Sequence, residues 1–177
     1  DMPFNEGEHK DIKRYDNAVI YVDSILGVFY EQCKNMPWFD NTLFILSSDH
    51  AHKYPGDYWY NDKERFHIPF IMFGKALKNE FKGKKTEQLV NQTDIPYSLS
   101  KQLGLKKQYF EFSKDIFSPY SPQFSTFTHI HGHDLILPDN FCFLNYEIPN
   151  NLYQETDSCL LKSGAYFQHV FDRYMGY

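Results

Sequence analysis

The stretch that decides the fold of this chain runs Thr42-Leu43-Phe44-Ile45-Leu46-Ser47-Ser48-Asp49-His50. Its apolar run is bounded by turn residues, a pattern typical of a strand buried on both faces. Strands of this kind belong to parallel sheets covered by helices. In open α/β sheets the chemistry lies just past the carboxyl ends of the strands. Asp49 and His50 fall at that position, so we expect an α/β fold with its functional site there.

The adjacent Asp49 and His50 are candidate metal ligands. A carboxylate beside an imidazole offers one hard oxygen and one borderline nitrogen, which together suit Zn²⁺ or Mn²⁺. Neighbouring residues of a regular strand point to opposite faces, so these two converge only if the pleat ends and the chain turns. The residues from Ala51 onward supply that turn. The alternative is a strand end capped by two polar side chains.

Length and composition are those of one globular domain. The 177 residues, 42% of them hydrophobic, are enough for a core of useful size. A net charge of −5 without a basic stripe argues against nucleic acid as a partner. No apolar run reaches membrane-spanning length and no signal peptide opens the chain. The first residues have the character of a loop cut from a longer protein.

Three cysteines are too few for a disulfide scaffold and lack zinc-finger spacing. Cys142 and Cys159 could pair in an oxidising compartment. We expect instead that these two and Cys33 are buried thiols.

Residues 9–36 are predicted to form one amphipathic helix, because apolar side chains recur there at helical spacing. Gly27 lies inside this helix at a propensity cost of about 1 kcal/mol, which a close approach of the helix to the sheet would explain. The predicted apolar stripe consists of Tyr15, Ala18, Val19, Val22, Ile25, Leu26, Phe29 and Cys33.

Further elements follow the central strand. Residues 66–74 read as a second buried strand, and residues 86–93 as a short strand or extended segment. Residues 94–104 carry the signals of a short helix, with Asp94 as its N-cap. We therefore interpret Asp94 as a cap and not as a catalytic group.

The pattern changes near residue 119 to short strands separated by turns, which is typical of an antiparallel meander. A helix over residues 165–174 closes the chain. The predicted short strands are 124–131, 135–137, 141–144 and 160–161.

Other histidines are candidates for binding. His52 lies in a loop rich in Tyr and Trp after the strand end, where substrate contacts tend to be placed. His67 stands at the entry of the second strand, and its alternative role is structural. The cluster His129-Ile130-His131-Gly132-His133 resembles a second metal site, but Gly132 is expected to break the strand register.

Taken in order, these pieces resemble the C-terminal part of the catalytic domain of the sulfatase branch of the alkaline phosphatase superfamily. Within that branch the chain is most similar to the lipoteichoic acid synthase and phosphoethanolamine transferase groups. The resemblance covers roughly residues 9–118. It rests on residues 15–27 as the helix before the metal strand, 41–50 as the Asp-His metal motif, 67–74 as the next strand, and 92–104 as an Asp, Pro, helix, Leu-Gly element.

Two departures qualify the resemblance. The Asp-His motif of the family is usually followed by Gly or Thr, whereas Ala51 follows it here. The nucleophile of the family, a Thr or a modified Cys or Ser, lies far upstream, and no Cys in this chain has a Cys-x-Pro-x-Arg context. No catalytic nucleophile is therefore assigned. Residues 1–177 are expected to be the C-terminal part of one catalytic domain, with an α/β portion at 9–118 and hairpins with a closing helix at 119–177.

The resemblance implies a mainly parallel sheet sandwiched by helices, with a small antiparallel sheet at the C-terminal end. It implies a metal-dependent enzyme that transfers a phosphoglycerol or phosphoethanolamine group. Asp49 and His50 would supply half of the metal ligands, and His52 and His67 would contact the anionic substrate or leaving group. The alternatives are a sulfuric or phosphoric ester hydrolase on the same fold and a non-catalytic binding or structural module.

The implied cofactor is Zn²⁺ or Mn²⁺, with Ca²⁺ or Mg²⁺ as alternatives. The implied partner is an anionic phosphate or sulfate ester, including lipid-linked esters. The expected location is the extracytoplasmic face of the cell envelope, with membrane attachment through an upstream segment. The chain alone is expected to be inactive because the nucleophile lies outside it.

Overall fold

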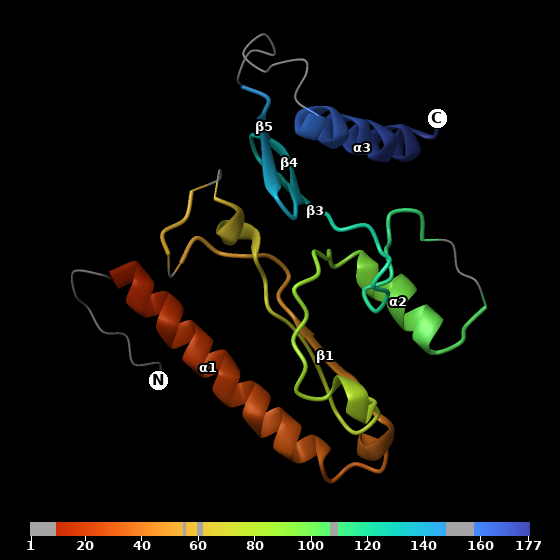
Figure 1. Ribbon diagram of the computed structural model, residues 1–177. Coiled ribbons are helices and arrows are strands. Elements are labelled where there is room, and N and C mark those ends of the chain that lie inside the picture. The colour runs from red at the N-terminus through yellow and green to blue at the C-terminus, as the bar shows by residue number, and fades with distance from the viewer. Residues whose placement is uncertain (1–9, 55, 60–61, 107–109, 148–157) are drawn as a thin grey trace. The chain divides into compact units, whose positions relative to one another are not determined.

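The structure is a computed structural model that describes all residues except 1–9, 55, 60–61, 107–109 and 148–157. The chain divides into two compact units, residues 1–85 and 86–177. Figure 1 labels most of the helices and strands of both units.

The first unit combines one long helix with a two-stranded sheet. Strands β1 and β2 pair antiparallel, with Phe44 opposite Phe73 and Ser47 opposite Phe70. The elements are α1 (Lys10–Cys33), η1 (Phe39–Asn41), β1 (Phe44–Ser47), η2 (Lys63–Phe66), β2 (Phe70–Phe73) and η3 (Asn79–Phe81).

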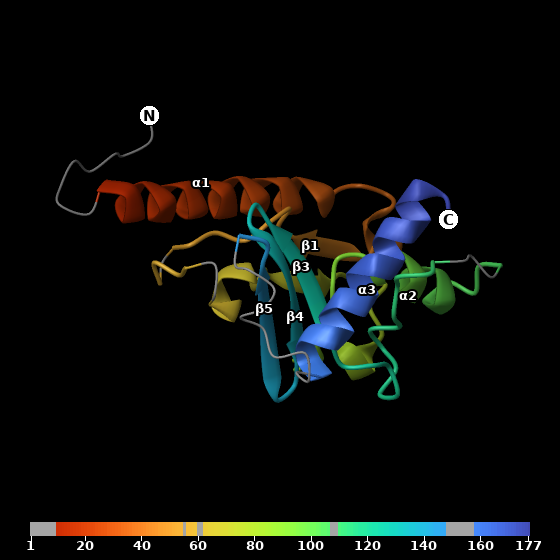
Figure 2. The same ribbon diagram turned by 90° about the horizontal axis from the view of Figure 1, so that it is seen from above.

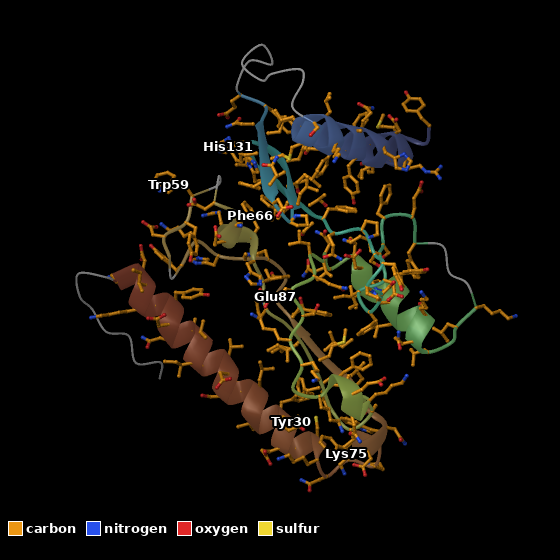
Figure 3. All side chains as sticks on the ribbon, viewed as in Figure 1. Tyr30, Trp59, Phe66, Lys75, Glu87 and His131 are labelled. Carbon is orange, nitrogen blue, oxygen red and sulfur yellow. A yellow bond between two sulfur atoms is a disulfide. The ribbon has the colours of Figure 1, made fainter. Side chains whose placement is uncertain are left out.

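The expected mainly parallel sheet is therefore wrong for this strand pair, and the described residues contain no parallel pair. The apolar runs were correctly recognised as strands, but an apolar run reports burial and not strand direction. Burial is also less than expected, because Phe44, Ile45 and Leu46 are only half-buried. An aromatic cluster stabilises the pairing of β1 with β2. The rings of Phe44 and Phe73 stack with their centres 5.2 Å apart. Tyr30 of α1, labelled in Figure 3, contacts both rings edge-on.

Helix α1 confirms the predicted long helix with slightly shorter bounds, and Figure 2 shows it as one uninterrupted helix. The predicted apolar stripe is largely exposed, since Val22, Ile25 and Phe29 each keep about half of their surface accessible. Of the helix, only Cys33 is buried. A Cβ added at Gly27 would meet no atom within 4 Å, so the close approach of helix to sheet that we expected there is not found in the described structure.

The second unit contains a three-stranded antiparallel sheet covered on one face by a helix. Its strand order is β3-β4-β5, and α3 packs against β4 and β5. The small core joins Leu135 and Cys142 of the sheet to Cys159 of the helix. The elements are α2 (Asp94–Gln102), β3 (Ser125–His129), β4 (Gly132–Leu137), β5 (Asn140–Asn145) and α3 (Ser158–Met175).

The predicted hairpins and closing helix are confirmed, with two corrections. Residues 86–93, expected as a short strand or an extended segment, are not assigned to a strand. Leu160 and Leu161 belong to α3 and not to the predicted strand. Two adjacent apolar residues fit a helix as well as a strand, so the sequence pattern did not distinguish the two. Cys142 and Cys159 form a disulfide with their Cα atoms 5.7 Å apart, so the expectation of three thiols is wrong for these two, and only Cys33 is free.

The expected role of Asp94 as the N-cap of its helix also needs correction. It opens α2, but its carboxylate does not cap that helix as an N-cap would. Oδ2 accepts the N–H of Asn91 at 2.7 Å, three residues back, as an acid in the first helical turn does in a capping box. Oδ1 accepts the N–H of Lys114 at 2.7 Å. The side chain therefore ties the start of α2 to a distant loop.

None of the helices in the described ranges combines the length and apolar character needed to cross a bilayer.

Candidate functional site

Asp49 and His50 lie just beyond the end of β1, where the pleat has ended and the chain bends. The bend is held by the Ser48 hydroxyl, which donates to the His50 carbonyl at 2.6 Å. The backbone N–H of His50 donates to Asp49 Oδ1 at 2.9 Å. These local bonds turn the two adjacent side chains toward each other, which a continuing strand would not allow.

The two candidate ligand atoms lie close together, with His50 Nε2 at 3.6 Å from Asp49 Oδ2. Two ligands about 2.0–2.1 Å from one tetrahedral ion would be about 3.3 Å apart. The observed spacing matches that requirement to within a few tenths of an ångström. A single ion can therefore touch both atoms after a small rotation of either side chain.

The protonation states of the pair also suit a cation. His50 Nδ1 lies 2.8 Å from the Ala51 carbonyl oxygen, which can only accept, so we assign the proton to Nδ1. Nε2 is then left with its lone pair. The backbone N–H of His50, which donates to Asp49, is the main cause that holds the pKa of Asp49 below its usual value. Asp49 is therefore an ionised carboxylate at neutral pH.

The pair is open to solvent. The side chains of Asp49 and His50 keep 86% and 77% of their surface exposed. The described residues hold no group of three or more His, Cys, Asp or Glu placed to bind an ion. Two protein ligands fit a divalent ion but do not complete a catalytic zinc site, which usually has three.

His52 lies two residues further, in the loop after the bend. Its ring stacks on Tyr15 of α1, with ring centres 4.9 Å apart and planes at 15°. Its Nδ1 accepts the N–H of Tyr54 at 3.2 Å. His52, Tyr15 and Tyr54 line a hollow of about 410 Å³. Asp49 and His50 do not line it, so the metal candidates and the hollow are neighbours along the chain.

The other predicted binding residue, His67, directly follows η2 and is exposed. Its backbone N–H donates to the Glu64 carbonyl at 3.3 Å. It is not among the residues that line the hollow beside His52. The structure thus brings His52, but not His67, into a concave surface next to the Asp-His pair.

The histidine cluster of the C-terminal sheet is divided among separate partners. The turn between β3 and β4 reverses the chain, so that Gly132 pairs with His129. The side chain of His133, the next residue of β4, therefore lies on the opposite face of the sheet from that of His129. His131, at this end of the sheet, lies with Nδ1 2.9 Å from Glu147 Oε1 (Figure 3). His133 Nδ1 lies 2.6 Å from the Tyr146 hydroxyl. The expected break at Gly132 is wrong in its position, because the chain turns before it, at Ile130 and His131, and Gly132 begins β4 in regular pairing. The described structure shows no metal-binding group among the three imidazoles.

Two groups of residues in the structure are not among those predicted from the sequence. Arg14 and Tyr15 line the hollow, although nothing in a helical pattern marks residues that contact a loop far along the chain. Asp134 is fully buried in β4 between His133 and Leu135. Asp134 falls between the predicted strands 124–131 and 135–137, so the sequence pattern gave no signal for its burial.

The comparison with protein families matches the region that contains the Asp-His pair. The sulfatase family model matches residues 2–105, which is more than half of the chain and includes Asp49, His50 and His52. No solved structure gives a significant match to the chain. Sulfatase-family enzymes generally use a divalent metal ion, which suits the carboxylate and imidazole found at the end of β1. The chain therefore belongs to the sulfatase family.

Proposed function

We propose that this chain supplies Asp49 and His50 as two ligands of a divalent metal ion in an enzyme acting on phosphate or sulfate esters. The observation that carries the proposal is the 3.6 Å spacing of Asp49 Oδ2 and His50 Nε2 inside the matched sulfatase region. The metal would be Zn²⁺ or Mn²⁺, because the ligands are one carboxylate oxygen and one imidazole nitrogen.

The chain's own residues prepare this pair. The His50 N–H keeps Asp49 ionised and fixes its Oδ1, which leaves Oδ2 directed at the imidazole. The Ala51 carbonyl fixes the His50 tautomer, so Nε2 is the ligand atom. When bound, the ion would supply positive charge at an ester oxygen and activate a hydroxyl nucleophile. The nucleophile and the remaining ligands would come from residues outside this chain, as the resemblance implies.

The finer assignment is transfer of a phosphoglycerol or phosphoethanolamine group to an acceptor alcohol. It is supported by the similarity of residues 15–27, 41–50, 67–74 and 92–104 to the corresponding transferases. The second candidate is hydrolysis of a sulfuric or phosphoric ester on the same fold. The third is a non-catalytic binding module.

We place the protein on the extracytoplasmic face of the cell envelope, with attachment through a segment outside this chain. The Cys142–Cys159 disulfide supports this location, because disulfides persist in oxidising compartments. A lipid-linked phosphate ester is the substrate that fits the location. The net charge of −5 supports the absence of nucleic acid among the partners.

Calorimetric titration of the chain with Zn²⁺ and Mn²⁺ tests the metal site. Weak binding is expected, and the Asp49→Asn and His50→Gln variants should each reduce it about tenfold or more. Asp57→Asn is the matched control, since Asp57 is an exposed carboxylate in the same loop with its charge paired to Lys53. Equal affinity in Asp49→Asn and Asp57→Asn would refute Asp49 as a ligand.

The longer protein distinguishes the three candidate activities. A Thr nucleophile and phospho-alcohol products with glycerol as acceptor would support transfer. A Cys-x-Pro-x-Arg motif and release of free phosphate or sulfate would support hydrolysis. The 177-residue chain alone should show no turnover of model esters, and turnover abolished by changing one of its own Ser or Thr residues would contradict this assignment.

A further inference from the structure

The start of α1 and the loop after His50 enclose a hollow of about 410 Å³ within the first unit. It begins two residues past His50, and two residues of extended chain span at most about 7 Å. A ligand held at the Asp-His pair can therefore extend into it. The hollow is lined by Asp11, Arg14, Tyr15, His52, Lys53 and Tyr54.

One wall of this hollow is aromatic and is held in place by contacts within the protein. The rings of Tyr15 and His52 stack 4.9 Å apart, and the Tyr54 ring lies 5.2 Å from His52. The Tyr54 N–H, which donates to His52 Nδ1, fixes the orientation of the imidazole. Flat rings of this kind pack against the carbon skeleton of a polyol or sugar.

The charged side chains of the hollow favour an anion. Arg14 and Lys53 both line it, and Asp11 is the one carboxylate that does so. The lining therefore carries a net charge of about +1, in a chain whose net charge is −5. Local positive charge on an acidic protein attracts anionic ligands to that place.

Neither cation is tightly held by its acidic neighbour. Arg14 Nη1 lies 3.7 Å from Asp11 Oδ1, and both side chains are more than half exposed. Lys53 Nζ lies 3.2 Å from Asp57 Oδ1, with both again solvent-accessible. Exposed pairs of this kind contribute little, so an anion can compete for both cations. The guanidinium retains N–H donors in the planar arrangement that binds phosphate and sulfate oxygens.

We propose that the hollow binds a second anionic group of the substrate, a phosphate or sulfate separated by a short linker from the reacting ester. Arg14 and Lys53 bind this second group, and Tyr15 packs against the linker. The substrate class is therefore a poly-ester with closely spaced anionic groups and not an isolated mono-ester. This inference rests on the proposed function for the placement of the first group.

The experiment compares the mono-ester and bis-ester phosphates of propane-1,3-diol as ligands of the chain, by calorimetry in Zn²⁺-containing buffer. The bisphosphate should bind about tenfold more tightly than the monophosphate. That preference should disappear in Arg14→Gln and survive in Lys13→Gln, which removes the same charge from the neighbouring position outside the hollow. Equal affinity for the two ligands, or equal loss in the two variants, would overturn the proposal.

Two further measurements separate the possible outcomes. The bis-sulfate of propane-1,3-diol, tested beside its mono-sulfate, shows whether the second group is phosphate or sulfate, and a preference for either bis-ester supports the proposal. Arg14→Lys should keep part of the preference because it keeps the charge. If Asp49→Asn leaves Zn²⁺ binding unchanged while Arg14→Gln still removes the preference, the metal assignment fails and the anion site stands.

Discussion

The Lys114 ammonium lies 2.8 Å from Asp94 Oδ2, and both side chains are almost completely buried, at 9% and 0% exposure. Lys114 Nζ also donates to the Phe124 carbonyl at 2.9 Å. The same carboxylate accepts the backbone N–H groups of Asn91 and Lys114. One buried ion pair thus joins the start of α2 to the segment that leads into β3, with its polar atoms satisfied on both sides.

Removing one partner of this pair should destabilise the second unit strongly. Lys114→Ala leaves the Asp94 carboxylate buried without its counter-ion, and the free energy of unfolding should fall by about 3–5 kcal/mol. Lys75→Ala in the first unit is the control, because Lys75 pairs with Asp40 while both side chains are more than half exposed, and the expected loss there is below about 1 kcal/mol. Urea denaturation followed by circular dichroism measures both. Similar losses in the two variants would show that burial does not determine how much the Asp94–Lys114 pair contributes to the free energy of unfolding.

The sequence predicts the helices and most strands of this fold, but not how the strands pair. Helical spacing of apolar residues is a local property, so α1 and α3 are recognised from the chain alone. The direction of β1 against β2 depends on the path of the loop between them, which carries no periodic signal. The disulfide likewise depends on Cys142 and Cys159 meeting in space.

The residues of the candidate site could likewise be predicted from the sequence only in part. Asp49 and His50 could be identified because they are adjacent at a predicted strand end, and their convergence needs only one local bend. The hollow could not be identified, because the Tyr15–His52 stack joins residues far apart in the sequence. Asp94 was recognised as a helix-start residue, but its link to Lys114 requires the tertiary fold.

The Cys142–Cys159 disulfide ties β5 to α3 and should account for a large share of the stability of the second unit. The two cysteines are separated by 17 residues, and closing a loop of this length stabilises the folded state by about 3 kcal/mol. We expect the Cys142→Ala/Cys159→Ala double variant to lose about that much. Differential scanning calorimetry with and without a reductant checks it, with Cys33→Ala as the control for the free thiol. No shift in the melting temperature upon reduction would contradict the expected role.

Asp134 should make stability depend on pH. It is fully buried, its Oδ1 accepts the N–H of Leu144 at 2.9 Å, and its Oδ2 lies 3.1 Å from His129 Nε2. Burial raises the pKa of this carboxyl to about 7. Between pH 4 and 7 the folded protein therefore retains a proton that the unfolded chain releases. The free energy of unfolding should fall as pH rises through this window, by at most about 4 kcal/mol.

Asp134→Asn tests this dependence because the amide keeps the shape of the side chain and does not titrate. The variant should show a flatter stability profile than the native chain from pH 4 to 7, measured by urea unfolding at each pH. His133, whose pKa is lowered by burial and by His129, contributes with the opposite sign, gaining stability as pH rises. The difference between the two proteins isolates Asp134 from this background. Parallel profiles would show that the carboxyl is already ionised in the folded state.

Gly74 ends β2 in a conformation that only glycine adopts easily, with φ at +116°. A Cβ added there would lie 2.5 Å from the Thr42 carbonyl oxygen, a backbone atom that cannot move aside without disturbing the start of β1. Gly74→Ala should therefore destabilise the first unit by about 2 kcal/mol or more. Gly83 is the control: its φ is also positive, at +68°, but a Cβ there would meet nothing within 4 Å. Gly83→Ala should cost only about 1 kcal/mol.

Tryptophan fluorescence distinguishes these two glycine variants, because both tryptophans, Trp38 and Trp59, belong to the first unit. Urea unfolding followed by this signal should give a clearly lower midpoint for Gly74→Ala than for Gly83→Ala. Both substitutions add the same methyl group at a positive φ, so the difference measures the clash with Thr42 together with the additional backbone strain at the φ of +116° of Gly74. That clash exists only if β1 and β2 pair in the antiparallel register with Phe44 opposite Phe73. Equal midpoints would therefore count against the register of the strands that position Asp49 and His50.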